Sequence, residues 1–103
     1  MEKFRVKIEP EALADIRDIV HWYNLAQKGL GERFRKTVIG QINSLGKNPK
    51  IYAVRYRQIR CAIVKKFPYM VHFFVNEDNK TVEVMAVFST SRNPKIWTER
   101  IDE

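Results

Sequence analysis

The segment from residue 59 to residue 75 constrains the fold most strongly, because it contains two apolar runs rich in β-branched and aromatic residues. These runs, Ile59–Val64 and Tyr69–Val75, are separated by Lys65, Lys66, Phe67 and Pro68. Proline cannot donate a hydrogen bond to a neighbouring strand, so Pro68 marks a turn or the first residue of the second run. The two runs therefore predict adjacent antiparallel strands at the centre of a sheet.

The residues before this segment predict one strand and two helices. Residues 3–9 alternate between apolar and charged side chains, as in a half-buried strand. Apolar residues then recur every three or four positions from Glu11 to about Gln27 and from Gly31 to Gly46, which predicts two amphipathic helices. Their apolar stripes are Leu13, Ile16, Val20 and Tyr23 on the first helix, and Phe34, Val38, Ile42 and Leu45 on the second. Glycine at 29 and 31 indicates a short turn, so we expect an antiparallel helical hairpin.

Further elements follow on either side of the central runs. Ile51–Tyr56 is a weaker candidate for an edge strand, and Thr81–Phe88 alternates as a strand does. Lys95–Ile101 is a candidate for a last helical turn or two, carrying Trp97. The order predicts an α+β fold: an N-terminal strand, an antiparallel two-helix hairpin packed on one face of a curved antiparallel sheet of four or so strands, and a short C-terminal helical tail. Residues 1–103 suit a single domain.

Composition fits a folded intracellular domain. The chain is 45% hydrophobic and 12% aromatic, which is enough for a core and argues against disorder. No apolar run approaches the roughly 20 residues that span a bilayer, and the chain does not begin with a signal-peptide pattern. The single cysteine, Cys61, excludes an intramolecular disulfide and fits a reducing compartment. We therefore expect a cytoplasmic protein without membrane association.

The net charge of +7 is concentrated in the middle of the chain. Ten of the nineteen lysines and arginines lie between Arg33 and Asn76, where there is no acidic residue. Three of them, Arg60, Lys65 and Lys66, belong to the central apolar segment. Our hypothesis is that this hairpin is both the core of the fold and the floor of one cationic surface, which attracts polyanions. A solvated basic surface that only keeps the protein soluble is the alternative.

A succession of short features covers nearly the whole chain in order. They are Asp15, Ile16, Ile19 and Trp22-Tyr23; Phe34, Ile42 and Leu45 leading into Asn48-Pro49; Tyr52, Ile59-Arg60 and Phe67-Pro68-Tyr69; then Ala86-Val87-Phe88, Arg92-Asn93-Pro94 and Trp97. Together they resemble the RelE/ParE superfamily of bacterial type II toxins, which includes plasmid stabilisation proteins. The resemblance implies a small toxin, encoded beside an antitoxin that wraps and neutralises it. RelE-like members cut mRNA on the ribosome, and ParE-like members poison DNA gyrase.

This resemblance implies which residues would act on a phosphodiester. Arginine stays charged and forks onto phosphate oxygens, so Arg60, placed where the family has a strand arginine, is the first catalytic candidate. Arg92 resembles the arginine of the closing motif. Lys65 is a third candidate, because neighbouring cations disfavour its protonated form and allow it to act as a base. Arg55, Arg57 and Lys66 are candidates for binding nucleic-acid phosphates. The structural alternatives are solvated surface cations, an Arg60 that covers the sheet edge, and an Arg92 that caps the tail.

The sequence departs from the family in its C-terminal part. Ser89 stands where many relatives have a histidine, no histidine follows His72, and no tyrosine follows Tyr69. This weakens the ribonuclease interpretation and favours a toxin that binds gyrase or has no chemistry, although Tyr56, Tyr69 or a lysine could substitute. His72 is better interpreted as a structural histidine of the sheet than as a base.

The two separated histidines and single cysteine do not form a metal site, and nothing resembles a phosphate or dinucleotide loop, so we expect no metal and no cofactor. The expected partners are a cognate acidic antitoxin and either the ribosome with its mRNA or DNA gyrase. A non-toxic basic nucleic-acid-binding domain of the same fold is the alternative function.

Overall fold

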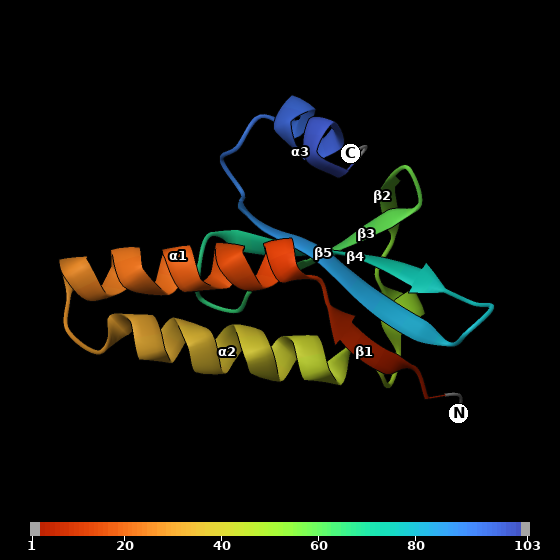
Figure 1. Ribbon diagram of the computed structural model, residues 1–103, viewed down its shortest axis with the longest axis horizontal. Helices are drawn as coiled ribbons and strands as arrows, with labels where there is room; N and C mark the ends of the chain where they lie inside the picture. Colours follow the sequence, from red (N-terminus) through yellow and green to blue (C-terminus); the bar gives the residue numbers. More distant parts are fainter. Residues whose placement is uncertain (1–2, 102–103) are drawn as a thin grey trace.

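The structure is a computed structural model that describes residues 3–101. Within this range the elements follow the predicted α+β order (Figure 1). They are β1 (Arg5–Ile8), α1 (Pro10–Ala26), α2 (Leu30–Ser44), the short 3-10 helix η1 (Pro49–Ile51), β2 (Val54–Tyr56), β3 (Ile59–Ile63), β4 (Tyr69–Asn76), β5 (Thr81–Ser89) and α3 (Pro94–Ile101). Within the described residues, no helix is both long and apolar enough to cross a membrane.

The sheet has the strand order β1-β5-β4-β3-β2, so the predicted β3–β4 hairpin does lie at its centre. Neighbouring strands run antiparallel, except that β1 is parallel to β5. The predicted antiparallel sheet of four or so strands is confirmed for β2–β5, and the N-terminal strand β1 adds a parallel neighbour, so the whole sheet is mixed. The reason is that β1 is connected to the other strands through the whole helical hairpin, and a connection of that length allows a parallel neighbour. The predicted strand at 51–56 divides into η1 and the shorter β2.

Helices α1 and α2 pack on one face of the sheet and form the main core with it (Figure 1). The predicted stripe of α2 is confirmed, because Phe34, Val38 and Ile42 are fully buried. On α1, Leu13 differs from the prediction: it is 44% exposed, and Ala12 and Ile19 are buried instead. The outer apolar positions of a helix can lie beside its neighbour rather than beneath it, and periodicity alone does not separate these cases.

The connection between α1 and α2 uses its two glycines for different purposes. Gly29 has a φ of 88°, in the left-handed region that glycine adopts without strain. Gly31 permits close packing instead: a Cβ atom there would lie 2.3 Å from the carbonyl oxygen of Val20. The Gly31 N–H donates to Oδ1 of Asn24 at 2.8 Å, which fixes the two helices together.

The predicted C-terminal tail is α3, which covers the opposite face of the sheet (Figure 1). Trp97 is buried there against Met70, Ala86 and Phe88. Trp22 of α1, by contrast, is 60% exposed. The surroundings of the two tryptophans differ because α3 folds back onto the sheet over Trp97, whereas no element of residues 3–101 covers the side of α1 that carries Trp22.

Asp15 of α1 holds α3 to the rest of the molecule. Its two carboxylate oxygens accept hydrogen bonds from Nη1 and Nη2 of Arg100, each at 2.8 Å. Oδ2 also accepts a bond from the backbone N–H of Val87 at 2.9 Å. This N–H needs a side-chain partner because β1 ends at Ile8, opposite Val84, and leaves the rest of that edge of β5 without a neighbouring strand.

Candidate functional site

Arg60, the first catalytic candidate, lies in β3 opposite Phe73, on the face of the sheet that carries the helices. Its Nη1 donates hydrogen bonds to the carbonyl oxygens of Tyr52 at 2.5 Å and Lys50 at 3.4 Å. The guanidinium therefore ties the η1–β2 segment to β3. This contact is a structural role, and a catalytic role for Arg60 stays a prediction.

Arg55 lies in β2, the edge strand that pairs with β3, and Arg57 follows directly after it. Arg55 is exposed in β2, and its charge acts on the Cys61 and His72 side chains. Arg57 lies in the turn between β2 and β3 together with Gln58, and both have positive φ values, 42° and 65°. Two such residues form the turn that matches the twist of a two-residue β-hairpin.

Lys65 and Lys66 are exposed in the turn between β3 and β4, at the opposite end of β3 from Arg57. Gln41 of α2 holds this turn, because its side-chain amide donates to the carbonyl of Ile63 at 2.8 Å and accepts from the N–H of Lys65. The Gln41 amide thus makes the two hydrogen bonds that a peptide group of a neighbouring strand would make at this edge of β3. Both lysines point to solvent from a fixed backbone.

Arg92 is exposed in the loop between β5 and α3, with its guanidinium carbon 5.7 Å from the centre of the Phe88 ring. It helps to line a polar cleft of about 160 Å³, whose other residues include Asp18, Tyr69 and Ser89. The N–H of Thr90 donates to the carbonyl oxygen of Pro68 at 2.9 Å, which joins this loop to the β3–β4 turn. Arg92 therefore lies at the same end of the sheet as Lys65 and Lys66.

The expectation of one cationic surface over the central hairpin is therefore wrong. Alternation along β3 directs Arg60 to the helix-bearing face, while the turns place the other cations at opposite ends of the strand. The structure brings Lys65, Lys66 and Arg92 to one end of the sheet. It places Arg55 and Arg57 in the edge strand β2 and in the turn that follows it. The catalytic and phosphate-binding roles of all these residues stay predictions.

A cluster that the sequence did not identify as a unit lies beneath α3. His72 is fully buried, and its Nδ1 lies 2.8 Å from the Tyr56 hydroxyl and 3.3 Å from Sγ of Cys61. The ring of Trp97 covers it, with centroids 4.8 Å apart. Strand alternation placed Cys61 and His72 on one face, but the contact with Tyr56 depends on a register shift in β2 that no sequence pattern signals.

Burial keeps this cluster neutral near pH 7. Burial, together with the smaller effects of the Arg55 and Arg100 charges, lowers the pKa of His72 to about 4. Burial also raises the pKa of Tyr56, and it raises the pKa of the Cys61 thiol to about 11 despite the nearby Arg55. A neutral, covered imidazole and a protonated thiol are poorly placed to exchange protons with a substrate.

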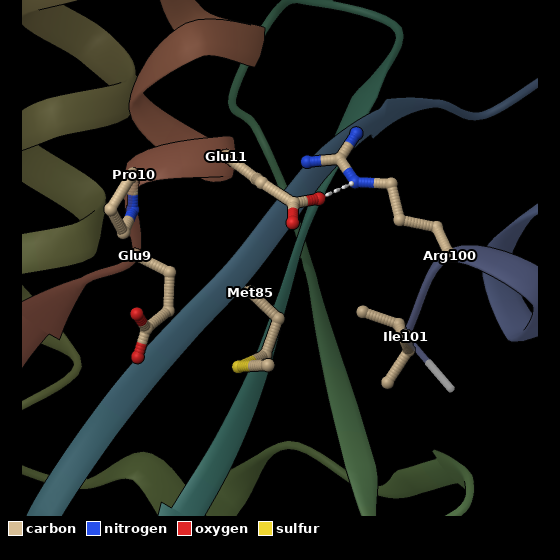
Figure 2. A pocket seen from close by; sticks show the side chains of 6 residues that line it. All are labelled: Glu9, Pro10, Glu11, Met85, Arg100 and Ile101. Atoms are coloured by element: carbon tan, nitrogen blue, oxygen red, sulfur yellow. Dashed lines mark hydrogen bonds and ion pairs between the residues drawn. The ribbon is translucent and has the colours of Figure 1, made fainter. Parts of the chain in front are cut away.

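Two further hollows differ in their chemistry. A cleft of about 190 Å³ lies between the start of α1 and the end of α3, and its charged lining comes from Glu9, Glu11 and Arg100. Figure 2 shows Arg100 directed to Glu11, with Glu9 on the opposite side of the cleft. Arg100 is bound to Glu11 at 2.9 Å and to Asp15, and Glu9 lies 3.7 Å from Nζ of Lys7. The arginine that lines the cleft is therefore already engaged by carboxylates, and the cleft is best explained by the attachment of α3.

The second hollow is a groove of about 360 Å³ between α1 and α2. Its apolar lining comes from Leu13, Ile16 and Ile39, and its charged lining from Arg17 and Arg35. We call these five residues the helical groove. Both arginines are exposed, so the groove presents apolar surface beside two guanidinium groups.

The fold is similar to solved structures of bacterial toxins. A chain of the chromosomal ParDE toxin-antitoxin system from P. aeruginosa matches with a TM-score of 0.75 and 16% identity, covering 84% of this chain and 96% of that chain. A mutant of the E. coli toxin RelE in the free state matches with a TM-score of 0.70 and 17% identity, covering 99% and 97%. The RelBE2 toxin-antitoxin complex from Mycobacterium tuberculosis gives 0.65 and 16%, covering 86% and 93%. At these identities the similarity shows the fold alone.

Comparison with curated proteins gives no match. A sequence model of one family, described as the ParE toxin of the type II toxin-antitoxin system parDE, matches residues 6–94. This range extends from β1 to the first residue of α3, so it includes every strand and both helices of the hairpin within the described residues. The chain belongs to the ParE toxin family of type II toxin-antitoxin systems, which confirms the resemblance to the RelE/ParE superfamily.

Proposed function

We propose that this protein arrests bacterial growth by binding DNA gyrase in the cytoplasm, without chemistry of its own, and that an acidic antitoxin neutralises it. The observation that carries the proposal is that the histidine and the cysteine of the sheet are poorly placed to exchange protons with a substrate. His72 is fully buried beneath Trp97, and the neighbouring thiol has a pKa of about 11. The predicted cations lie at separate places instead of converging on one cleft, which favours a binding surface over a reaction centre.

Membership in the ParE family supports the same choice of target, because ParE-like members of the superfamily poison gyrase. Cleavage of mRNA on the ribosome is the second candidate. The observation in its favour is the fold similarity to the free E. coli toxin RelE, which spans 99% of this chain. The two candidates predict different damage in the cell, so one experiment separates them.

Controlled expression tests the target. We expect growth arrest with double-strand DNA breaks and a filamentous morphology, while total mRNA stays intact. Arrest with cleaved mRNA and undamaged chromosomes would favour the ribosome instead. Unchanged growth at high expression of the folded protein would favour the non-toxic nucleic-acid-binding domain.

The helical groove is the surface that best suits the antitoxin. Three apolar residues with Leu13 at its exposed side offer a hydrophobic anchor, and Arg17 and Arg35 flank it with positive charge. An amphipathic acidic segment is complementary to both properties, since its apolar side chains enter the groove and its carboxylates meet the guanidinium groups. Arg35 also pairs with Glu32 at 3.6 Å, an exposed contact that a partner carboxylate can replace at little cost.

Reversing the chemistry of the groove tests this surface. We expect Leu13→Glu to weaken binding of the protein encoded by the adjacent reading frame by at least a hundredfold, and to leave growth arrest intact but no longer rescued. Leu25→Glu is the matched control, because Leu25 is 74% exposed on the same helix and lies outside the groove. Isothermal titration calorimetry and co-expression growth curves give the two measurements. Equal effects of the two variants would contradict the assignment.

A further inference from the structure

Two large apolar side chains lie exposed beside each other on α1. Trp22 is 60% exposed and Leu25 is 74% exposed, and residues three apart on a helix are neighbours on its surface. Single exposed apolar residues are common in folded proteins, but adjacent ones of this size form a patch that gains stability when a partner removes it from water. We therefore asked which partner this part of α1 fits.

The patch is held in a fixed shape by the core beneath it. The Trp22 ring packs edge-on against Tyr23, with centroids 5.2 Å apart. Tyr23 is buried, and it packs in turn on Phe34 of α2 at 5.6 Å and on Phe67 of the β3–β4 turn at 5.4 Å. A partner therefore meets a preformed surface and does not have to order it.

The patch also lies apart from the helical groove. Leu13 lines the groove, and Trp22 follows it by nine residues, which is about two and a half turns of an α-helix. The two side chains therefore point to opposite sides of α1. In Figure 1 the end of α1 that leads into α2 extends beyond the sheet, which leaves this side of the helix accessible. An antitoxin segment in the groove and a second partner on the patch can bind at the same time.

Opposite charges lie at the two ends of the patch. Asp18 is exposed one turn before Trp22, and Lys28 is exposed three residues after Leu25, in the link between α1 and α2. Along the chain the order is acid, apolar pair, base, and this order is complementary to its own reverse. A two-fold symmetric contact requires such self-complementarity, because each end of the surface meets the other end of the same surface in the second copy. We call Asp18, Trp22, Leu25 and Lys28 the outer α1 patch.

We propose that the outer α1 patch joins two copies of this chain, with their α1 helices antiparallel across a two-fold axis near residue 23. The apolar pairs of the two copies pack together at the centre, and Asp18 of each copy lies beside Lys28 of the other. The second copy is the partner that the order of charges selects, since a reversed copy matches both ends at once. This contact goes beyond the proposed action on gyrase and does not depend on it.

The size and charge of the chain make this dimer a weak one. Stable complexes bury about 800 Å² on each partner, and two large side chains with two flanking charges cover less than that. Each copy also carries a net charge of +7, so the two copies repel each other until salt screens the repulsion. The dimer is therefore expected to form and dissociate with concentration, at physiological ionic strength, in the micromolar range.

Sedimentation velocity of the purified full chain over a hundredfold range of concentration tests the proposal. We expect the sedimentation coefficient to rise from that of a monomer to that of a dimer. Over the same range, iodide should quench tryptophan fluorescence progressively less at constant ionic strength. The reason is that Trp22 becomes covered in the dimer, whereas Trp97 is buried in both states.

Exchange of the two charges tests the antiparallel geometry. Asp18→Lys and Lys28→Asp each place like charges at both ends of the contact, so each variant alone is expected to dimerise about tenfold more weakly. An equimolar mixture of the two variants should recover the dimer, because opposite charges then meet at both ends. Lys47→Asp is the matched control, since it changes the net charge as Lys28→Asp does, at an exposed position between α2 and η1. It is expected to leave dimerisation unchanged or slightly stronger.

Replacement of the apolar pair tests the centre of the contact. Trp22→Ala and Leu25→Ser are each expected to weaken the dimer about tenfold, in line with the apolar surface lost. Leu25 is exposed, so its replacement leaves the core intact, and circular dichroism verifies the folding of every variant. Ile51→Ser is the control, because Ile51 is 66% exposed in η1, away from the patch. A folded protein that stays monomeric at every concentration, a mixture of the charge variants that does not recover, or an equal loss in Ile51→Ser would overturn the proposal.

Discussion

His72 carries a proton in an unfolded chain below about pH 6.5, but the folded protein holds this side chain in a site that disfavours the charge. Burial beneath Trp97 is the main cause, and with the charges of Arg55 and Arg100 it lowers the pKa of His72 to about 4. The sequence was sufficient to interpret His72 as a structural residue of the sheet. It did not reveal how strongly folding depends on keeping the imidazole neutral.

The protein is therefore expected to lose stability as the pH falls from about 6.5 to about 4. In this range the unfolded chain binds a proton at His72 and the folded protein does not, so protonation favours unfolding, by up to about 3 kcal/mol at the lower limit. His72→Asn, whose amide can still bond to the Tyr56 hydroxyl, should remove this component. Urea unfolding at pH 4.5 and pH 7 for both proteins measures it. Parallel pH profiles of the two proteins would be inconsistent with the buried, neutral imidazole.

A second residue-scale prediction concerns the turn between β2 and β3. Gln58 has a φ of 65°, a conformation that costs a residue with a Cβ about 1–2 kcal/mol and costs glycine nothing. Gln58→Gly should stabilise the protein by about 0.5–1 kcal/mol, since the greater freedom of glycine in the unfolded chain offsets part of the gain. Thermal unfolding followed by circular dichroism gives the answer. Gly29 is the converse control, because Gly29→Ala places a side chain at a φ of 88° and should destabilise.

At the scale of elements, the helical hairpin depends on close approach at one point. The sequence correctly placed a turn at residues 29–31 and began the second helix at Gly31, but it gave this glycine no role in packing. Gly31 in fact lies inside α2 and faces the backbone of Val20. Propensity describes each helix alone, so it gave no sign that a neighbouring helix excludes a Cβ atom there.

Gly31→Ala is expected to destabilise the protein by about 2–3 kcal/mol, because the new Cβ would overlap the Val20 carbonyl oxygen and the Asn24 side chain. Gly40→Ala is the matched control in the same helix. A Cβ at Gly40 meets nothing within 4 Å, and alanine favours the helix by up to about 1 kcal/mol. Chemical unfolding of both variants measures the difference. Similar stabilities for the two would show that α1 and α2 are not packed as closely as described.

The strands show a related limit of sequence reasoning. Alternation and turn residues were sufficient to predict β3, β4 and β5, because each is a long run with one clear period. The edge strands β1 and β2 are short, and side chains of α1 and α2 complete the uncovered edges: Asp15 bonds to β5 and Gln41 bonds to the end of β3. Such contacts join residues more than twenty positions apart, so no local pattern predicts them.

At the scale of the whole molecule, the family and the layered fold could be predicted from the sequence, but the arrangement of the cations could not. The ten cations between Arg33 and Asn76, with no acidic residue among them, establish that this part of the chain is basic. They do not tell on which face or end of the sheet each side chain lies. Arg60 turns toward the carbonyls of Lys50 and Tyr52, whereas Arg92 folds over Phe88 at the end of the sheet. Exposed cations on several sides suit a protein that acts by binding a large partner.

The most direct test of this account is the effect of the purified protein on purified DNA gyrase and supercoiled plasmid in the presence of ATP. After rapid denaturation and protease treatment, we expect linear plasmid to accumulate in proportion to the toxin added, and to disappear when the antitoxin from the adjacent reading frame is present. Intact plasmid at every concentration, together with cleaved mRNA in a purified translation mixture, would contradict it.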